Sequence, residues 1–273
     1  MKLIAHYLSL NSQWTRSLTG HTATVRCMKF VDATTAVSAS RDGDLRIWNL
    51  ETGACEGTLS GHQDTIFDLA ITSKYAISGS KDGTARVWSL PERRETSRLS
   101  GHTKTVWSVA TNGEKVVTGS LDTDVRVWDL TTGESLAVLK GHTAMVSHSL
   151  IDGDVLFTGS ADGKIIIWSL QDYTVLYTIP KAHEGAVSSL DVHGEYMLSG
   201  GSDGKVKLWD SKTAECLGDI GTQTQAVWGV SLGRADDHKN VIVASAQGTS
   251  AFPKHGGAFL DVSLCSQIDP HAA

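Results

Sequence analysis

Residues 101–129 read GHTKTVWSVATNGEKVVTGSLDTDVRVWD, a stretch that opens on a Gly-His pair and closes on a Trp-Asp pair. The opening pair recurs along the chain. Its copies are Gly20-His21, Gly61-His62, Gly101-His102 and Gly141-His142, with Ala182-His183 as a fifth. Successive histidines lie 41, 40, 40 and 41 residues apart. A unit of about 40 residues therefore repeats five times and decides the architecture.

Each copy of the unit predicts four short strands. In the quoted copy an apolar run (105–111) follows the histidine, a second run (115–120) leads into a tight turn, and a third (125–130) contains the tryptophan. A more polar stretch completes the unit. Asp-Gly, a strong hairpin signal, forms the turn in most copies. We therefore predict an all-β fold in which the repeats stack, because no repeat can bury both faces of its sheet alone.

Three residue types keep a fixed spacing inside the unit. An aspartate stands six residues before each closing tryptophan, and a histidine stands 20 or 21 residues before that aspartate. The sets are His21, Asp42 and Trp48; His62, Asp82 and Trp88; His102, Asp122 and Trp128; His142, Asp162 and Trp168; and His183, Asp203 and Trp209. Gly-His at the start and Trp-Asp at the end are typical of the blades of a WD-repeat β-propeller.

The repeat boundaries predict a single propeller domain over residues 1–273 with about six blade units. We expect a partial blade at the N-terminus, five clear repeats and one degenerate blade at the C-terminus. The predicted ranges are 1–18 for the partial blade, 19–59, 60–99, 100–139, 140–180 and 181–220 for the repeats, and 221–273 for the degenerate blade.

Composition narrows the classes of partner. The chain has a formal net charge of −6, with 20% charged and 40% hydrophobic residues, as in soluble globular proteins. The negative charge argues against a nucleic-acid partner, which needs a basic face, and no apolar run has membrane-spanning length. The four cysteines form no Cys-x-x-Cys motif, so we expect no zinc site or disulfide framework. We expect no cofactor, and a location in the nucleus or cytoplasm.

Each repeat also holds the residue types of a hydrolase triad. In the first repeat these are His21, Ser38 or Ser40, and Asp42. A triad needs a histidine base oriented by an aspartate, but an enzyme needs one site and this set recurs five times. An indole N–H can only donate, so a chain from Trp48 through serine and histidine to aspartate would satisfy buried polar groups. We therefore predict a structural network and no enzyme.

Candidate binding residues are those that vary at fixed positions of the repeat. One position lies five residues after the histidine, and the other lies just before the turn aspartate. The candidates are Arg26, Phe67 and Trp107 at the first position, Trp228 at the matching position of the last blade, and Arg41 and Lys81 at the second position. Both positions are near strand ends, so we expect these side chains to share one rim around the channel. Arginine forks beside exposed aromatics predict an acidic or phosphorylated peptide as ligand.

Several stretches resemble one family more closely. They are GHTATVRCM (20–28) with SASRDGDLRIWNLETGAC (38–55), the repeat at 101–135 with its Ser-Leu-Asp-Thr turn, and SDGKVKLWDSKTAECL (202–217) with AVWGVSL (226–232). These are similar to blades of the F-box/WD-repeat substrate receptors of SCF ubiquitin ligases, of the cell-division-control type. The resemblance extends over residues 15–232 and more loosely over the rest.

This resemblance implies an eight-bladed ring and recognition of phosphorylated degrons by arginines on one face. Six units with the curvature of that family would leave a gap in the ring, as in a truncated set, whereas tighter curvature would close it. Arg26 and Arg41 match two of those arginines, whereas Phe67 and Gly229 stand where the family has arginine. The F-box that recruits the ligase core is absent, so ubiquitin-ligase partners would require that region to be supplied. The alternative is a general WD-repeat scaffold for multiprotein assembly, without phosphopeptide specificity.

Overall fold

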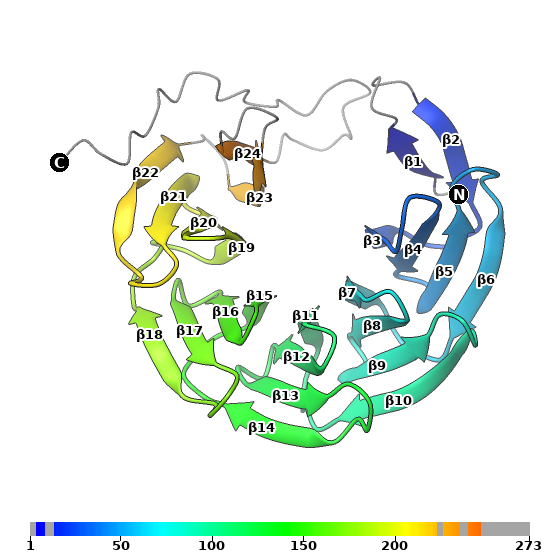
Figure 1. The fold of residues 1–273 in the computed structure, drawn as a ribbon, viewed down its shortest axis with the longest axis horizontal. Coiled ribbons are helices and arrows are strands. Elements are labelled where there is room, and N and C mark those ends of the chain that lie inside the picture. The colour runs from blue at the N-terminus through cyan, green and yellow to red at the C-terminus, as the bar shows by residue number, and fades with distance from the viewer. Residues whose placement is uncertain (1–3, 9–13, 223–225, 235–239, 247–273) are drawn as a thin grey trace. The chain divides into compact units, whose positions relative to one another are not determined.

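The structure, a computed structural model, describes residues 4–8, 14–222, 226–234 and 240–246. Every regular element among these residues is a β-strand, as predicted (Figure 1). No helix long and apolar enough to cross a membrane occurs in this part of the chain. The residues fall into two compact units, Met1–Gly153 (unit 1) and Asp154–Ala273 (unit 2), which we describe separately.

Unit 1 contains a two-stranded hairpin and three four-stranded antiparallel sheets. The hairpin is β1 (Ile4–Leu8) with β2 (Trp14–Thr19). The sheets are β3 (Val25–Phe30), β4 (Thr35–Ser40), β5 (Asp44–Asn49) and β6 (Cys55–Ser60); β7 (Ile66–Ile71), β8 (Tyr75–Ser80), β9 (Thr84–Ser89) and β10 (Arg94–Ser100); and β11 (Val106–Thr111), β12 (Lys115–Ser120), β13 (Val125–Asp129) and β14 (Ser135–Leu139). The unit ends with β15 (Val146–Asp152), which packs beside β11.

Unit 2 continues the same pattern of antiparallel neighbours. Its strands are β16 (Val155–Ser160), β17 (Ile165–Ser169) and β18 (Val175–Ile179); β19 (Val187–His193), β20 (Tyr196–Gly201), β21 (Lys205–Asp210) and β22 (Cys216–Thr222); and β23 (Val227–Arg234) with β24 (Asn240–Ala246). Of the predicted degenerate blade at 221–273, residues 223–225, 235–239 and 247–273 lie outside the described residues.

Tight turns join the second and third strands of each sheet. Gly43 and Gly83 adopt left-handed φ values of 84° and 82° there, as expected of Asp-Gly hairpins. Thr123 takes the same place in the Ser-Leu-Asp-Thr turn with φ 76°. A β-branched residue is uncommon in this region. The turn is held by hydrogen bonds from Thr123 N–H to the Ser120 carbonyl (3.2 Å) and from Asp124 N–H to the Asp122 carboxylate (3.1 Å).

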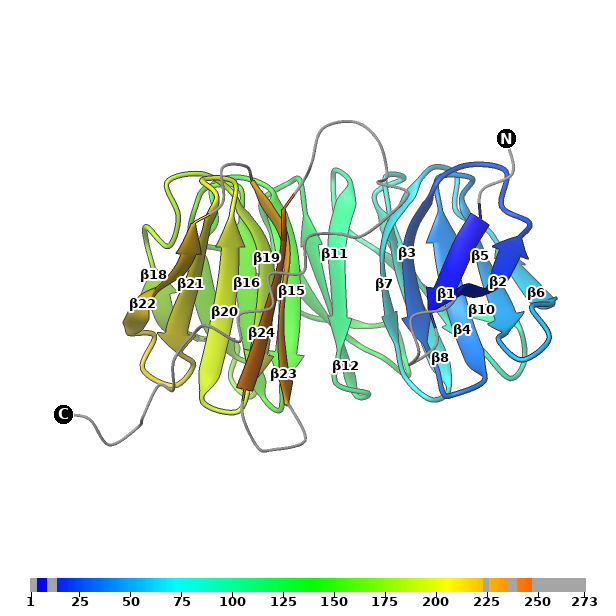
Figure 2. The same ribbon diagram turned by 90° about the horizontal axis from the view of Figure 1, so that it is seen from above.

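The hydrophobic core of unit 1 lies between neighbouring sheets. Val37 and Leu45 from the first sheet share one buried cluster with Ile66, Leu69 and Trp88 from the second. A second cluster joins the second sheet to the third in the same way. The first strands β3 and β7 pack directly against each other (Figure 2). Each sheet therefore buries its faces with the help of the next one, which is the reason that a single repeat cannot fold alone.

Candidate functional site

A chain of hydrogen bonds crosses the first four-stranded sheet. Trp48 Nε1 donates to the Ser38 hydroxyl over 2.7 Å, and that hydroxyl lies 2.7 Å from His21 Nε2. His21 Nδ1 lies 2.9 Å from the Asp42 carboxylate. The ionised Asp42 carboxylate can only accept, so Nδ1 of His21 carries the proton that it receives. Burial lowers the pKa of His21, so Nε2 carries no proton at neutral pH and accepts the hydroxyl proton of Ser38. His21 is therefore the neutral tautomer that carries its proton on Nδ1.

The same chain recurs in three further repeats, with Ser78, Thr118 and Ser199 in the place of Ser38. The histidine-to-hydroxyl distances are 2.8, 2.8 and 2.7 Å. The indole-to-hydroxyl distances are 2.8, 2.9 and 2.8 Å. The residues involved are His62, Asp82 and Trp88; His102, Asp122 and Trp128; and His183, Asp203 and Trp209.

The fourth repeat, like the third, uses a threonine hydroxyl. Trp168 donates to Thr158 over 2.9 Å, His142 is buried, and Asp162 accepts the N–H of Lys164 over 2.9 Å. The expectation of serine in every repeat is thus wrong for the third and fourth, where threonine supplies the hydroxyl. The substitution works because both residues present an oxygen on Cβ, and threonine suits a strand.

Burial sets the charge state of this network. It lowers the pKa of His21, His102 and His183 below the ordinary 6.5, although the neighbouring aspartates act in the opposite direction. Burial alone would raise the pKa of Asp42 and Asp122. Backbone N–H donors and the histidine side chains nevertheless hold the pKa of both carboxyls below the usual 3.8. At pH 7 neutral histidines therefore face ionised aspartates.

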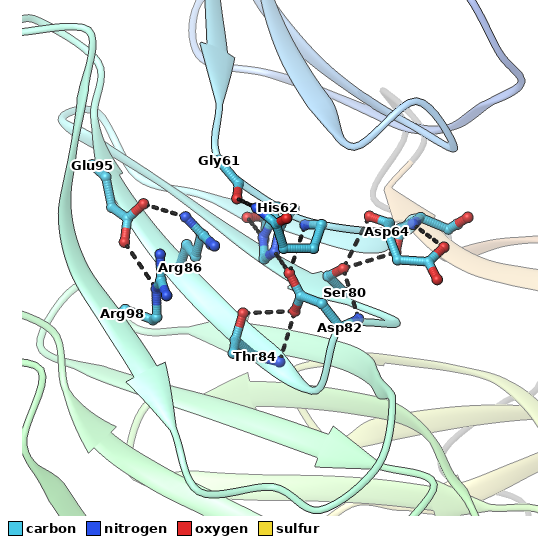
Figure 3. A network of polar contacts seen from close by, with 12 residues as sticks. Gly61, His62, Asp64, Ser80, Asp82, Thr84, Arg86, Glu95 and Arg98 are labelled. Carbon is cyan, nitrogen blue, oxygen red and sulfur yellow. Dashed lines mark hydrogen bonds and ion pairs between the residues drawn. The ribbon is translucent and has the colours of Figure 1, made fainter.

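In the second repeat several donors converge on the aspartate of the network (Figure 3). Asp82 accepts hydrogen bonds from the hydroxyl of Thr84 (2.7 Å), from the N–H of Thr84 (2.9 Å) and from His62 (2.8 Å). Ser78 is completely buried and already bonded to both an indole and an imidazole. A hydroxyl in this position is closed to a substrate. The geometry therefore supports a structural role for the repeated His-Ser-Asp set.

The glycine of the Gly-His pair makes room for a neighbouring arginine. A Cβ at Gly101 would lie 2.7 Å from Nη1 of Arg126, two residues before the closing tryptophan. A Cβ at Gly20 or at Gly61 would approach the guanidinium of a neighbouring arginine in the same way. In the fifth repeat Lys207 takes the arginine position, and its ammonium lies 5.6 Å from the ring centre of Trp209. That repeat has Ala182 instead of glycine, consistent with the removal of the crowding guanidinium.

β-bulges place three of the variable candidates side by side. The ladder between the first two strands shifts register at Arg26, Phe67 and Trp107, and a bulge redirects the side chain of its extra residue. The guanidinium carbon of Arg26 lies 5.3 Å from the centre of the Phe67 ring. Phe67 in turn stacks on Trp107, with 4.2 Å between ring centres and 20° between planes. We call these three residues the rim stack.

The two turn candidates lie at the same edge of their sheets. The N–H of Arg41 donates to the carbonyl of Thr24, two residues before Arg26, and the N–H of Lys81 donates to the carbonyl of Thr65, two residues before Phe67. Arg41 and Lys81 are both exposed. The Lys81 ammonium, however, lies 3.1 Å from the Asp64 carboxylate. Its charge is therefore partly compensated, so it adds less positive charge to the rim than the sequence predicts.

Trp228 is the sixth candidate and belongs to unit 2. It sits at the bulge between Val227 and Gly229 and is 58% exposed, which makes it the most exposed large apolar side chain in the described part of the chain. The structure thus brings Arg26, Phe67 and Trp107 together and puts Arg41 and Lys81 at the same sheet edges. It describes Trp228 only within its own unit.

Sequence reasoning missed two aspartates that tie one sheet to the next. Asp68 accepts the N–H of Val109 over 2.9 Å from the neighbouring sheet, and Asp191 accepts the N–H of Leu232 over 2.7 Å. Burial raises the pKa of Asp68. Because these aspartates stand at different positions of their repeats, the periodicity did not single them out. Both bonds satisfy backbone donors and have a structural role.

The described residues contain no metal-binding cluster and only free thiols. No group of three or more histidine, cysteine, aspartate or glutamate side chains among the described residues could hold a metal ion. Cys27, Cys55 and Cys216 are free thiols. Burial raises the pKa of Cys27 far above its ordinary value, so this thiol stays protonated at neutral pH. Cys265 lies outside the described residues.

Curated relatives match short segments of the chain. An alignment over 76 residues, which covers 25% of this chain, is 36% identical to Pre-mRNA-splicing factor PRP46 of Eremothecium gossypii and covers 18% of it. A 65-residue segment, 24% of this chain, is 32% identical to Cell division control protein 4 of Saccharomyces cerevisiae and covers 8% of it. A 55-residue segment, 19% of this chain, is 47% identical to Coronin-7 of Mus musculus and covers 6% of it. The chain thus matches less than a fifth of the length of each relative.

The fold itself has a close counterpart among solved structures. The structure of U3-55K matches with a TM-score of 0.74 and 22% identity, over 85% of this chain and 77% of that one. The family model "WD domain, G-beta repeat" matches residues 12–49, 53–89, 93–129, 133–169 and 173–210, more than half of the chain. These findings confirm the predicted WD-repeat propeller fold, and the chain belongs to the WD domain, G-beta repeat family.

Proposed function

We propose that this WD-repeat protein-interaction scaffold binds an acidic or phosphorylated protein segment along the rim of unit 1. The observation that carries the proposal is the rim stack, in which the guanidinium of Arg26 lies over Phe67 and Phe67 lies against Trp107. The bulge position that presents these side chains is one of the positions at which the repeats differ from one another. A surface that varies on a constant scaffold is where a specific partner is recognised.

The charge of the rim favours an anionic ligand. Neither Arg26 nor Arg41 has an ion-pair partner among the described residues, and both are exposed. Stacking on Phe67 restricts the orientation of the Arg26 guanidinium, while the N–H groups at its edge stay available for a carboxylate or phosphate. We place the anionic group of the ligand between Arg26 and Arg41.

The aromatic part of the rim stack defines the rest of the ligand. Phe67 and Trp107 are half-buried, so each keeps part of its ring surface open to solvent. Apolar atoms next to the anionic group of a peptide would cover this surface and gain from its burial. Lys81 contributes less, because the nearby Asp64 carboxylate partly compensates its charge. The preferred segment therefore carries one strong negative charge beside an apolar residue.

A narrower form of the proposal is that the bound segment is a phosphorylated degron and that the chain is the substrate-recognition part of an SCF-type ubiquitin ligase. Arg26 and Arg41 support it, because they match two degron-binding arginines of that receptor family. The 32% identity to Cell division control protein 4 over 65 residues also supports it. Free cysteines are compatible with the nucleus or cytoplasm, where we place the protein.

The test is peptide binding measured by fluorescence anisotropy, with matched phosphorylated and unphosphorylated peptide libraries. Arg26→Glu and Arg41→Glu are each expected to weaken binding of the selected phosphopeptides by about tenfold or more, which corresponds to about 1.4 kcal/mol. Arg94→Glu makes the same charge change on the outer strand β10, where Arg94 forms an ion pair with the exposed Glu92 and donates to the carbonyl of Glu95. This control variant should bind like the unmodified protein.

Two results would contradict the proposal. One is equal binding of phosphorylated, acidic and neutral peptides by the unmodified protein. The other is unchanged phosphopeptide binding in both Arg26→Glu and Arg41→Glu. Either result would favour the general scaffold, which assembles partners without phosphopeptide specificity.

A further inference from the structure

The outer strand of the third sheet has an unprotected edge. β14 lies at the end of the strand order β11-β12-β13-β14, so one side of its backbone has no partner strand in that sheet. Exposed edges usually carry charges or proline, which prevent pairing with another chain. The corresponding strand β10 carries Arg94, Glu95 and Arg98. β14 reads SLAVL, without charge or proline, and exposes Leu136 and Val138 to 40% and 41%.

Two opposite charges frame this apolar edge. Glu134 precedes β14 and Lys140 follows it, and both are exposed. Neither side chain has an ion-pair partner among the described residues of the chain. Each stands three residues from Ala137, the centre of the strand. An antiparallel copy with Ala137 opposite Ala137 would therefore bring Glu134 opposite Lys140 and Leu136 opposite Val138.

We propose that two copies of this chain associate through their β14 strands, which pair edge to edge and antiparallel about a two-fold axis. In this register even-numbered residues lie opposite even-numbered residues, and odd-numbered residues lie opposite odd-numbered ones. Paired side chains therefore lie on the same face of the joined sheet, as antiparallel pairing requires. Each contact then occurs twice, as in an isologous dimer. The interface holds backbone hydrogen bonds, two Leu–Val pairs and two Glu–Lys pairs.

The other apolar edge of the described chain fits a second copy less well. β18 exposes Val175, Leu176 and Tyr177. Its flanking charges are already engaged, because Asp172 accepts the hydroxyl of Thr174 over 2.9 Å and Lys181 lies 2.9 Å from Glu184. Pro180 follows the strand and lacks the N–H that edge pairing would use. β14 therefore differs from β18, because the charged residues at both of its ends have no ion-pair partner among the described residues and are complementary to those of a second copy.

The size of the interface predicts a weak dimer. A five-residue strand pair buries less than the ~1,200 Å² that stable protein complexes reach. Association should therefore depend on protein concentration, and it should weaken in high salt because the two charge pairs are exposed to solvent. The dimer of β14 edges is independent of peptide binding at the rim.

The experiment is sedimentation velocity on the full chain at concentrations up to ~1 mM, a range that captures millimolar affinities. Glu134→Lys and Lys140→Glu each place like charges opposite one another twice, and each should weaken self-association by about tenfold or more. The double variant restores both pairs and should associate like the unmodified protein. An equimolar mixture of the two single variants should form a heterodimer, since every contact is then complementary.

The matched control is Leu176→Lys, which charges the edge of β18 and should leave the dimer intact. The proposal is overturned if the unmodified chain stays monomeric over the whole range, or if both single charge reversals dimerise normally. It is also overturned if the mixture of single variants fails to associate, or if Leu176→Lys abolishes the dimer. All altered side chains are exposed, so the fold is expected to survive each change.

Discussion

Replacing Ser78 by alanine isolates the energetic role of the repeated network. The Ser78 hydroxyl accepts the indole N–H of Trp88 over 2.8 Å and bonds to Nε2 of His62 over 2.8 Å, and it is completely buried. Alanine removes the hydroxyl and leaves two buried polar groups without a partner. Each such group costs about 1–3 kcal/mol, so the variant should lose about 2–6 kcal/mol of unfolding free energy.

The chain itself supplies the matched control for this prediction. Thr118 occupies the same place in the third sheet and makes the same two bonds, at 2.8 and 2.9 Å. Ser78→Thr keeps the hydroxyl and should stay within about 1 kcal/mol of the unmodified protein, whereas Ser78→Ala should not. Urea unfolding followed by tryptophan fluorescence measures both, from the shift in midpoint at constant slope. A Ser78→Ala variant as stable as Ser78→Thr would refute the assignment of the network as a stabilising element.

Two further predictions concern acid sensitivity and close packing. Burial lowers the native pKa of His21, His102 and His183 below the 6.5 of the unfolded chain, so below about pH 6.5 the unfolded state binds more protons. The unfolding free energy should therefore fall as the pH drops from 7.5 to about 5.5, as measured by urea midpoints, and a constant or rising midpoint would contradict this. Gly79→Ala would bring a Cβ within 2.8 Å of Val106 Cγ1 and 3.0 Å of Val109 Cγ1, both buried, and should cost about 1–3 kcal/mol in the same assay. Gly221→Ala is the control, because no atom lies within 4 Å of its new Cβ. Equal stability of the two variants would contradict the packing argument.

The sequence predicts the sheets well because their determinants are local and repeated. Asp-Gly turns, runs of β-branched residues and a tryptophan every 40 or so residues define strand positions without reference to distant contacts. The pairing of Trp48 with Ser38 follows from donor and acceptor chemistry, although the sequence left Ser40 as an alternative. The structure decides between them: Ser40 accepts the backbone N–H of Asp42 instead.

The candidate site is less accessible to sequence reasoning because it depends on contacts between sheets. The positions of Arg26, Phe67 and Trp107 follow from the repeat, but their stacking depends on how neighbouring sheets are placed. The Lys81–Asp64 ion pair escapes notice because Asp64 has no counterpart at the same position of the other repeats. Periodic patterns identify what the repeats share, whereas binding depends on what they do not share.

The β-bulges at Arg26, Phe67 and Trp107 have a consequence for how such a surface can change over time. A bulged residue is extra to the ladder, so its side chain does not have to match a cross-strand neighbour. A substitution at this position changes the side chain that the rim exposes to a partner and leaves the pairing of the strands in place. The repeats of this chain already sample arginine, phenylalanine, tryptophan and serine at that one position. The fold thereby separates the residues that must be retained for folding from those that are free to diversify, so a new binding preference can arise by single substitutions without passing through an unstable intermediate.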